Sequence, residues 1–444
     1  MKKNKFHLSS FHFIVFGFAL LILGGTLLLM LPVSSAKGEA TPFWDALLTA
    51  TSASCVTGLV VFDTATYWSF FGQLVIISLI QIGGLGIVTL FLSFLMLSGL
   101  KIGLVQRRTL QDSVSAPELG GVVGFTKFIL AFVFSAELVG AVLLAFPFCH
   151  EFGFGKGLWY SVFHSVSAFC NAGFDLMGVK TPFSSLTHYV GDVWVNTVVM
   201  LLIVVGGLGF LTWQDIKKNR HHIRKYRMQS KLVLVVTAFL LIVPAVYYYF
   251  FEIASMDLSP WEKIIASLFQ SVTTRTAGMN TVDFDAMSEG GKLVTIGLML
   301  VGGAPGSTAG GMKVTTLGVL VVSAVAVFKR RQSPECFGRR LPVDIVTTAA
   351  AIFLLYLSFA LAGAVIISRV EDIPLLTALF ETASAVGTVG LTLGVTPGLG
   401  TVSKIIVTLM MFFGRVGGLT FVYVFMSGKV SQPSRLPEER IIVG

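Results

Sequence analysis

The chain has 444 residues, of which 54% are hydrophobic and only 12% are charged, and its mean hydropathy is +0.83. Soluble globular domains carry about 25% charged residues, so the composition excludes a water-soluble fold and indicates a polytopic membrane protein. The net charge of +9 does not indicate nucleic-acid binding, because the lysines and arginines collect in a few loops between apolar segments. The four cysteines show neither CxxC nor Cys/His spacing, which predicts no disulfide framework and no metal site.

Long apolar runs, each able to cross a bilayer, alternate with shorter segments along the whole chain. The long runs lie at 11–32, 70–98, 128–148, 192–213, 232–251, 292–328, 345–368 and 404–426. Within each successive pair lies a segment of about 12 residues, too short to span and typical of a re-entrant helix. These short segments are Phe43–Ser54, Leu158–Phe169, Trp261–Thr273 and Pro374–Ala385. The first run is as long as a full span, so we expect a retained helix and not a cleaved signal peptide.

Two glycine landmarks recur in register with this long–short–long order. The first follows the short segments, in "SASCVTGL", "SAFCNAGF", "TTRTAGMN" and "SAVGTVGLT", whose last glycines are Gly58, Gly173, Gly278 and Gly390. A serine precedes this glycine by six residues in three copies, whereas the third copy has Val272 there. The second landmark begins at Gly83, Gly206, Gly302 and Gly414. Four copies in register predict four structural repeats.

The expected fold is therefore an all-α polytopic membrane protein. We expect four repeats, each a long helix, a short re-entrant helix and a second long helix. The expected units are 1–100, 101–220, 221–335 and 336–430, followed by a tail at 431–444.

The basic residues predict the orientation. Most lysines and arginines lie in the N-terminal segment, in the loops after the second, fourth and sixth long runs, and in the C-terminal tail. By the positive-inside rule both termini are cytoplasmic and every short helix enters from outside. The same loops can also serve as a docking surface for a cytoplasmic partner.

The glycine stretches after the short helices are candidates for an ion path. Non-helical backbone cannot face lipid, but carbonyl rings around one axis can replace the water shell of a cation. We expect the stretch Ser384–Thr392 to be non-helical, and Thr388–Val389–Gly390 repeats the T-V-G core of potassium-channel filters. The candidate filter residues are Val56, Thr57, Gly58, Asn171, Ala172, Gly173, Thr276, Ala277, Gly278, Thr388, Val389 and Gly390. The alternative is that the glycines only permit close helix packing.

The sixth long run is interrupted by glycines and a proline that should break the helix. A loop at mid-membrane beneath the filter is a candidate gate. The alternative is that the loop only loosens the local helix packing and does not gate. Its residues are Gly302, Gly303, Ala304, Pro305, Gly306, Ser307, Thr308, Ala309, Gly310 and Gly311. Arg415, a costly charge within the last span, is a candidate latch on the carbonyls of this loop. The alternative is a structural arginine that caps carbonyls without controlling ion flux.

Other charges within or beside the membrane segments have simpler expected roles. Glu137 is expected to be neutral and hydrogen-bonded to a neighbouring helix, with an accessory cation site as the alternative. Asp45 and Glu262 lie in the first turns of their pore helices, where the helix dipole favours acids. Glu381 is expected to lend negative potential to the pore mouth. Arg275 is expected to point away from the axis, toward carbonyls or acids.

These motifs together resemble those of the Trk/Ktr/HKT superfamily of potassium transporters, and most closely its KtrB, or NtpJ-type, membrane subunits. The resemblance covers roughly residues 11–430 and rests on "SCVTGL", "FCNAGF", "RTAGMN", "GTVGLT", the broken sixth run and "GRVGGLTF". It implies four M1–P–M2 units around one pore, and two such chains in a homodimer. It assigns the filter to the twelve candidate residues and the gate to the Gly302–Gly311 loop with Arg415.

The resemblance also implies a function and partners. It implies potassium uptake down the electrochemical gradient at the plasma membrane, with sodium as a possible activator. It implies regulation by a cytoplasmic KtrA-like octameric ring of RCK subunits, which binds ATP or ADP, so this chain itself needs no cofactor. All four filter glycines are present, a pattern typical of potassium-preferring members, but the complete TVGYG occurs in no repeat.

The sequence is compatible with two other functions. One is a sodium-permeable or weakly selective cation pathway of the same fold. The other is a polytopic membrane enzyme, which would need acids, histidines or cysteines clustered at a membrane face. The intramembrane ionisable groups do not cluster in the sequence, so we expect no enzyme activity.

Overall fold

The computed structural model describes residues 10–86, 89, 121–331, 333–418 and 420. Four helices within this part of the chain are long and apolar enough to cross a membrane. They are α1 (Ser10–Leu29), α7 (Val122–Phe152), α11 (Met228–Tyr247, continued by the π-helix η5, Tyr248–Ile253) and α15 (Val343–Glu371). Large apolar side chains such as Leu20, Leu138 and Val365 are exposed on their surfaces, as expected of helices that face lipid.

A shorter helix follows each long one: α2 (Phe43–Cys55), α8 (Phe154–Cys170), α12 (Pro260–Thr273) and α16 (Leu375–Gly387). Local sequence sets where several of them begin. Pro42 and Pro374 precede α2 and α16, and α12 starts with Pro260 behind a capping box made by Ser259 and Glu262. The bounds agree closely with the expected short segments, except that α8 begins earlier than Leu158.

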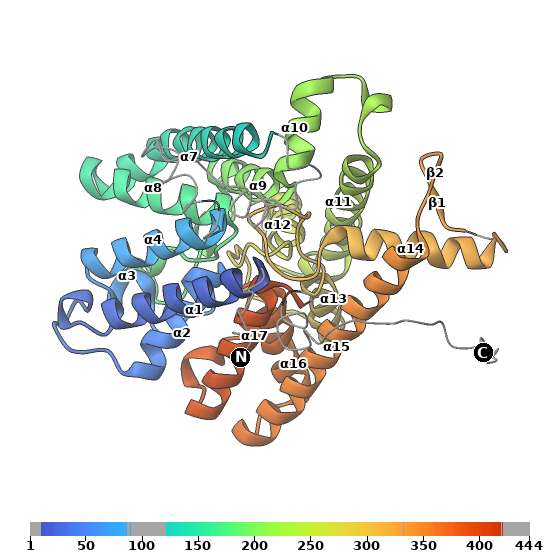
Figure 1. Ribbon diagram of the computed structural model, residues 1–444. Coiled ribbons are helices and arrows are strands. Elements are labelled where there is room, and N and C mark those ends of the chain that lie inside the picture. The colour runs from blue at the N-terminus through green and yellow to red at the C-terminus, as the bar shows by residue number, and fades with distance from the viewer. Residues whose placement is uncertain (1–9, 87–88, 90–120, 332, 419, 421–444) are drawn as a thin grey trace, which may run out of the picture.

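A third helix completes each unit: α4 (Phe70–Leu85), α9 (Val193–Gly207), α13 (Glu289–Met299) and α17 (Thr401–Val416). Each third helix packs on the short helix of the next unit, so α4 contacts α8, α9 contacts α12 and α13 contacts α16. The circle closes where α17 packs on α2, a junction that also contains an ion pair of 2.6 Å between Lys404 and Asp45. Figure 1 shows the units following one another around a common centre, from blue to red.

The unit boundaries at 220 and 335 remain predictions, because helix packing alone does not fix them. The predicted boundary at 100, the basic N-terminal segment 1–9, the loop within 90–120 and the tail 431–444 lie outside the described residues.

The third helices end at more glycines than expected. The sequence predicted a break only in the run 292–328, where a loop indeed separates α13 from α14 (Val314–Phe328). However, α4, α9 and α17 also end, at or just before Gly86, Gly209 and Gly417, where φ is +82°, +83° and +91°. The apolar run 192–213 is not one continuous helix, since α9 and α10 (Phe210–Asn219) meet at a bend of 94°. Each of these glycines lies three residues after a second-landmark glycine, and this backbone conformation favours glycine.

The remaining elements are short. A hairpin of β1 (Glu335–Cys336) and β2 (Arg339–Arg340) follows α14 and was not expected. Its turn residues Phe337 and Gly338 both have positive φ, as a two-residue type I′ turn requires. The others are α3 (Thr64–Tyr67), η1 (Pro32–Ser34), η2 (Met177–Val179), η3 (Thr187–Tyr189), η4 (Ile223–Lys225) and η6 (Thr396–Gly398).

Candidate ion pathway

The four first-landmark glycines meet in one ring, although more than 300 residues separate the first from the last. A methyl group placed on Gly58 would lie 2.7 Å from the carbonyl oxygen of Ala172 and 2.9 Å from the Cα of Gly173. A methyl group on Gly173 would likewise contact the backbone of the third stretch, and one on Gly278 would contact the backbone of the fourth. Gly390 closes the ring, because its methyl group would contact the carbonyl oxygen of Thr57. The ring therefore has no room for side chains, and a carbonyl oxygen from each stretch lies beside a neighbouring glycine.

Each stretch leaves its short helix by the same backbone device. The residue two positions before the ring glycine has a left-handed conformation in all four repeats: Val56, Asn171, Thr276 and Thr388, with φ between +51° and +65°. Such a conformation costs a β-branched residue about 1–3 kcal/mol and persists only where surrounding contacts enforce it. The expectation that the whole of Ser384–Thr392 is non-helical is wrong, since α16 runs to Gly387 and the non-helical backbone starts at Thr388.

Hydroxyl groups hold the stretches against their own helices. Ser52 accepts a hydrogen bond from the N–H of Gly58 at 2.9 Å, and Ser384 accepts one from the N–H of Gly390 at 3.0 Å. Ser167 instead donates to the carbonyl of Phe174, at 2.6 Å. The third repeat has Val272 in place of the serine, but the next residue, Thr273, donates to the carbonyl of Met279. The threonine directly after Val272 in the sequence was the signal that could have identified this hydrogen-bonding residue.

The second glycine landmark has a packing role. A side chain on Gly83, Gly206 or Gly414 would collide with the carbonyl oxygen of a residue at the end of the same unit's short helix. These carbonyls belong to Ser54, Phe169 and Val386, each four residues before a ring glycine. Close approach of the third helix to the short helix therefore requires glycine here. In the third repeat Gly302 instead packs against the Gly310 carbonyl within the loop.

A cavity of about 80 Å³ opens beside the ring and is lined by all four ring glycines. We call it the glycine-ring cavity. The carboxyl groups of Asp63 and Asp175 also line it, as does Thr392. Burial, and then the charge of Asp63, raise the pKa of Asp175 to about 7, so the negative charge at this cavity depends on pH near neutrality.

Three threonines of the candidate filter stretches have hydroxyl groups without a hydrogen bond. The hydroxyls of Thr57, Thr276 and Thr388 are buried and have no hydrogen-bond partner among the described residues. Buried polar oxygens are normally paired, so these three hydroxyls are exceptions within the described residues.

The loop between α13 and α14 passes directly beneath the fourth stretch. A methyl group on Gly310 would meet the side chain of Thr388, and one on Gly311 would lie 2.6 Å from the Gly387 carbonyl oxygen. The loop closes on itself through hydrogen bonds from Gly302 to Met312 at 2.7 Å and from Val314 to Gly303 at 3.0 Å. It is thus an ordered crossing and not a disordered insertion.

The bend between α9 and α10 receives this loop. The N–H of Ala304 donates to the Gly207 carbonyl at 2.9 Å, and the N–H of Phe210 donates to the Gly306 carbonyl at 2.8 Å. The hydroxyl of Thr308 donates to the Phe169 carbonyl at 3.0 Å, at the end of α8. Backbone groups freed by two helix breaks therefore satisfy each other, as buried backbone requires.

Arg415 joins the loop to the first repeat. Its guanidinium donates to the carbonyl oxygens of Thr308, Gly83 and Gly84, the last at 3.1 Å. One planar side chain thus bridges the loop, the end of α4 and its own helix α17.

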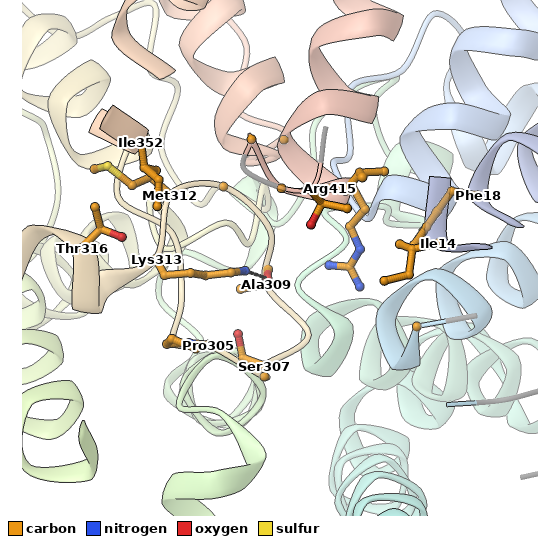
Figure 2. A pocket seen from close by; sticks show the side chains of 18 of the residues that line it. Ile14, Phe18, Pro305, Ser307, Ala309, Met312, Lys313, Thr316, Ile352 and Arg415 are labelled. Atoms are coloured by element: carbon orange, nitrogen blue, oxygen red, sulfur yellow. Dashed lines mark hydrogen bonds between the residues drawn. The ribbon is translucent and has the colours of Figure 1, made fainter. Parts of the chain in front are cut away.

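A second cavity, of about 350 Å³, lies beneath the loop. We call it the loop cavity. Loop residues such as Pro305 and Gly311 line it together with Arg415 and Lys313, whose Nζ donates to the Ala309 carbonyl at 2.7 Å. Figure 2 shows Lys313 reaching along the loop to Ala309, with Arg415 on the opposite side of the cavity. The loop, Lys313 and Arg415 thus form part of the wall of this cavity, and the ring glycines do not line it.

The other predicted charges make contacts with residues outside the ring. Glu137 is buried in α7 and accepts a hydrogen bond from Gln81 of α4 at 3.2 Å. Arg275 directs its guanidinium to the Val301 carbonyl, at 3.4 Å. Asp45 and Glu262 lie in the first turns of α2 and α12.

Comparison with known proteins identifies the family. A family model described as the cation transport protein TrkH matches residues 8–433. The potassium/sodium uptake protein NtpJ of Enterococcus hirae is 40% identical, over 100% of this chain and 99% of its own length. The Ktr system potassium uptake protein B of Bacillus subtilis is 40% identical, over 96% of this chain and 95% of its own.

Among solved structures, the potassium transporter TrkH from Vibrio parahaemolyticus has the same fold, with a TM-score of 0.75 at 19% identity, over 96% of this chain and 87% of that chain. The all-α polytopic membrane fold and the family resemblance are thereby confirmed. The relatives are named as transporters, which also confirms that the chain is not an enzyme. The chain belongs to the TrkH family of cation transport proteins.

Proposed function

We propose that this chain carries potassium ions into the cell across the plasma membrane, through the ring formed by Gly58, Gly173, Gly278 and Gly390. The observation that carries the proposal is this ring, in which four backbone stretches meet with carbonyl oxygens at their contacts and no side chain between them. The three residues that end at each ring glycine, twelve in all, form the selectivity filter.

The physical basis is the replacement of water by backbone oxygens. A ring of carbonyls can substitute for the hydration shell of a potassium ion. The short helices α2, α8, α12 and α16 end at the ring, and the negative ends of their dipoles favour a cation there. An inward potential then drives entry by about 2.3 kcal/mol per 100 mV, so the chain needs no energy-coupling site of its own.

The Gly302–Gly311 loop acts as the gate in this proposal. Its contact with the fourth stretch and its position above the loop cavity support that role. Arg415 latches the loop through the Thr308 carbonyl and places a positive charge beside the path. The glycine-ring cavity then faces the outside, the loop cavity faces the cytoplasm, and both termini are cytoplasmic.

Assembly and regulation follow the Ktr pattern in this proposal. Two chains form a homodimer in the bilayer, and a KtrA-like octameric RCK ring that binds ATP or ADP regulates them from the cytoplasm. Sodium acts as an activator. The support is the name of the Bacillus subtilis relative, which is a component of a Ktr system.

Rubidium uptake into liposomes tests the transport proposal. We expect purified chain in potassium-loaded liposomes, diluted into potassium-free medium, to accumulate rubidium tracer, because potassium efflux through the same path sets an inward-directed potential. Protein-free liposomes are the control. Absence of accumulation, both with and without the regulatory ring, would contradict the proposal.

A substitution at the first ring glycine separates potassium selectivity from the sodium-permeable alternative. We expect Gly58→Ser to reduce the preference for rubidium over sodium by about tenfold, because a side chain at φ +98° must displace the Ala172 carbonyl. The measurement is sodium and rubidium uptake by the same liposome preparation. Equal uptake of both ions by the unmodified chain would favour the weakly selective pathway.

A further inference from the structure

Glu381 is a fully buried carboxylate in the middle of α16 that takes no part in the ring itself. Its two oxygens accept three hydrogen bonds: from the Thr392 hydroxyl at 2.5 Å, the Leu393 N–H at 2.9 Å and the Thr396 hydroxyl at 2.7 Å. Burial of a carboxylate is costly unless such donors compensate it. All three donors lie in the segment that follows the fourth filter stretch, so Glu381 fixes this segment to the helix that precedes the filter.

The second repeat contains the same connection at the same positions. Glu381 lies nine residues before its ring glycine, and so does His164. His164 is buried and accepts, through Nε2, the N–H of Leu176 at 3.3 Å. Leu176 follows Gly173 by three residues, as Leu393 follows Gly390. Two unrelated side chains thus make the same connection at equivalent positions. We take this connection to be a structural feature of the repeat.

The other two repeats differ from this arrangement. In the third, Gln270 lies one position later and donates to the Val282 carbonyl at 2.8 Å, again beyond the ring glycine. In the first, Thr49 occupies the position of Glu381 and donates to the Asp45 carbonyl in its own helix. Compared with the ties made by His164 and Gln270, the one made by Glu381 has more hydrogen bonds and has a carboxylate as acceptor.

The segment held by Glu381 forms part of the wall of the glycine-ring cavity, because Thr392 lines that cavity. A backbone ring keeps its dimensions only if the segments on both sides of it are fixed, and hydrogen bonds from outside the ring supply this preorganisation. If the fourth stretch were released, the ring could contract around the smaller sodium ion.

We propose that Glu381 is a positioning residue that holds the outer end of the fourth filter stretch and thereby sets discrimination between potassium and sodium. The inference rests on the proposed transport function and extends it to a residue outside the twelve filter positions. Glu381 acts through Thr392, Leu393 and Thr396 and does not itself contact the ion.

Substitutions that separate shape from charge test this inference. Gln keeps an oxygen for the Leu393 N–H, and its amide can donate to a threonine hydroxyl, whereas Ala removes every bond. We expect Glu381→Ala to lower the ratio of rubidium to sodium uptake about tenfold and Glu381→Gln to lower it no more than about threefold. Uptake is measured in liposomes over a range of ion concentrations, so that KM and maximal rate are separated for each ion.

The control is Glu262→Gln, which alters a pore-helix carboxylate that caps only its own helix α12, and which should leave the ratio unchanged. If Glu381→Ala lowers the maximal rate for both ions equally and keeps KM and the ratio, the role is merely structural and the inference is wrong. If Gln is as harmful as Ala, charge and not positioning is responsible, which also overturns it.

A second variant covers the case in which Glu381→Ala does not yield folded protein. Thr392→Val with Thr396→Val removes two of the three hydrogen bonds while leaving the glutamate in place. We expect about a threefold lower ratio, and an unchanged ratio in this variant contradicts the inference. Failure of the unmodified chain to take up rubidium would instead count against the transport function itself.

Discussion

Gly58→Asp is expected to reduce rubidium uptake about 100-fold or more. Its Cβ would lie 2.7 Å from the Ala172 carbonyl oxygen and 2.9 Å from the Cα of Gly173, at a backbone φ of +98°. The strain of such a side chain is about 1–3 kcal/mol, and a carboxylate within the ring would also obstruct the path. Because each ~1.4 kcal/mol is a tenfold change, strain and obstruction together account for a loss of this size.

The measurement compares uptake by liposomes that contain equal amounts of monodisperse protein. Gly155→Asp is the matched control, because Gly155 lies exposed in the short helix α8, has no positive φ and has nothing within 4 Å of an added Cβ. This control should transport rubidium at the normal rate. Equal transport by Gly58→Asp and the unmodified chain would show that the ion does not pass through the ring.

The sequence predicted the ring because its cause is local and repeated. Each stretch must turn sharply out of a helix and then pass close to its neighbours, and both requirements select glycine at a fixed distance from a short helix. The positions of Gly58, Gly173, Gly278 and Gly390 therefore carried the signal without knowledge of any contact. The break at Gly302–Gly311 was predictable for the same reason, since five glycines and a proline cannot continue a helix.

The helix ends at Gly86, Gly209 and Gly417 were missed because glycine is also common within continuous membrane helices. Tertiary contacts stabilise the bend at Gly209. The loop packs into this bend, and its Gly306 carbonyl accepts the N–H of Phe210. This contact joins residues that are distant in the sequence, so no local pattern could reveal it.

The ties made by Glu381, His164 and Thr273 were missed for a related reason. Each is a different residue type that meets the same need, which is a polar partner for backbone just beyond a filter stretch. Alignment on the glycines places Glu381 and His164 at the same position, but an acid and an imidazole do not look equivalent until their hydrogen bonds are known.

Arg415→Ala is expected to increase rubidium uptake by the chain without its regulatory ring by about 30-fold. The guanidinium holds the loop to the first repeat through the carbonyls of Thr308, Gly83 and Gly84, and its removal should cost the closed arrangement about 2 kcal/mol. Removal of the positive charge should also lower the barrier to cations. Sodium uptake should rise as well, because the latch and the charge act on any cation.

The conservative variant distinguishes the two contributions of this residue. Arg415→Lys keeps the charge, but an ammonium cannot reproduce the planar set of donors that bridges the loop and α4. If latching dominates, Arg415→Lys should behave like Arg415→Ala, and if charge dominates, it should behave like the unmodified chain. Arg340→Ala, at an exposed arginine of the β-hairpin, is the control that should change nothing. Unchanged or uniformly lower uptake in Arg415→Ala would mean that the arginine only stabilises the fold, because a gate that loses its latch must open more often.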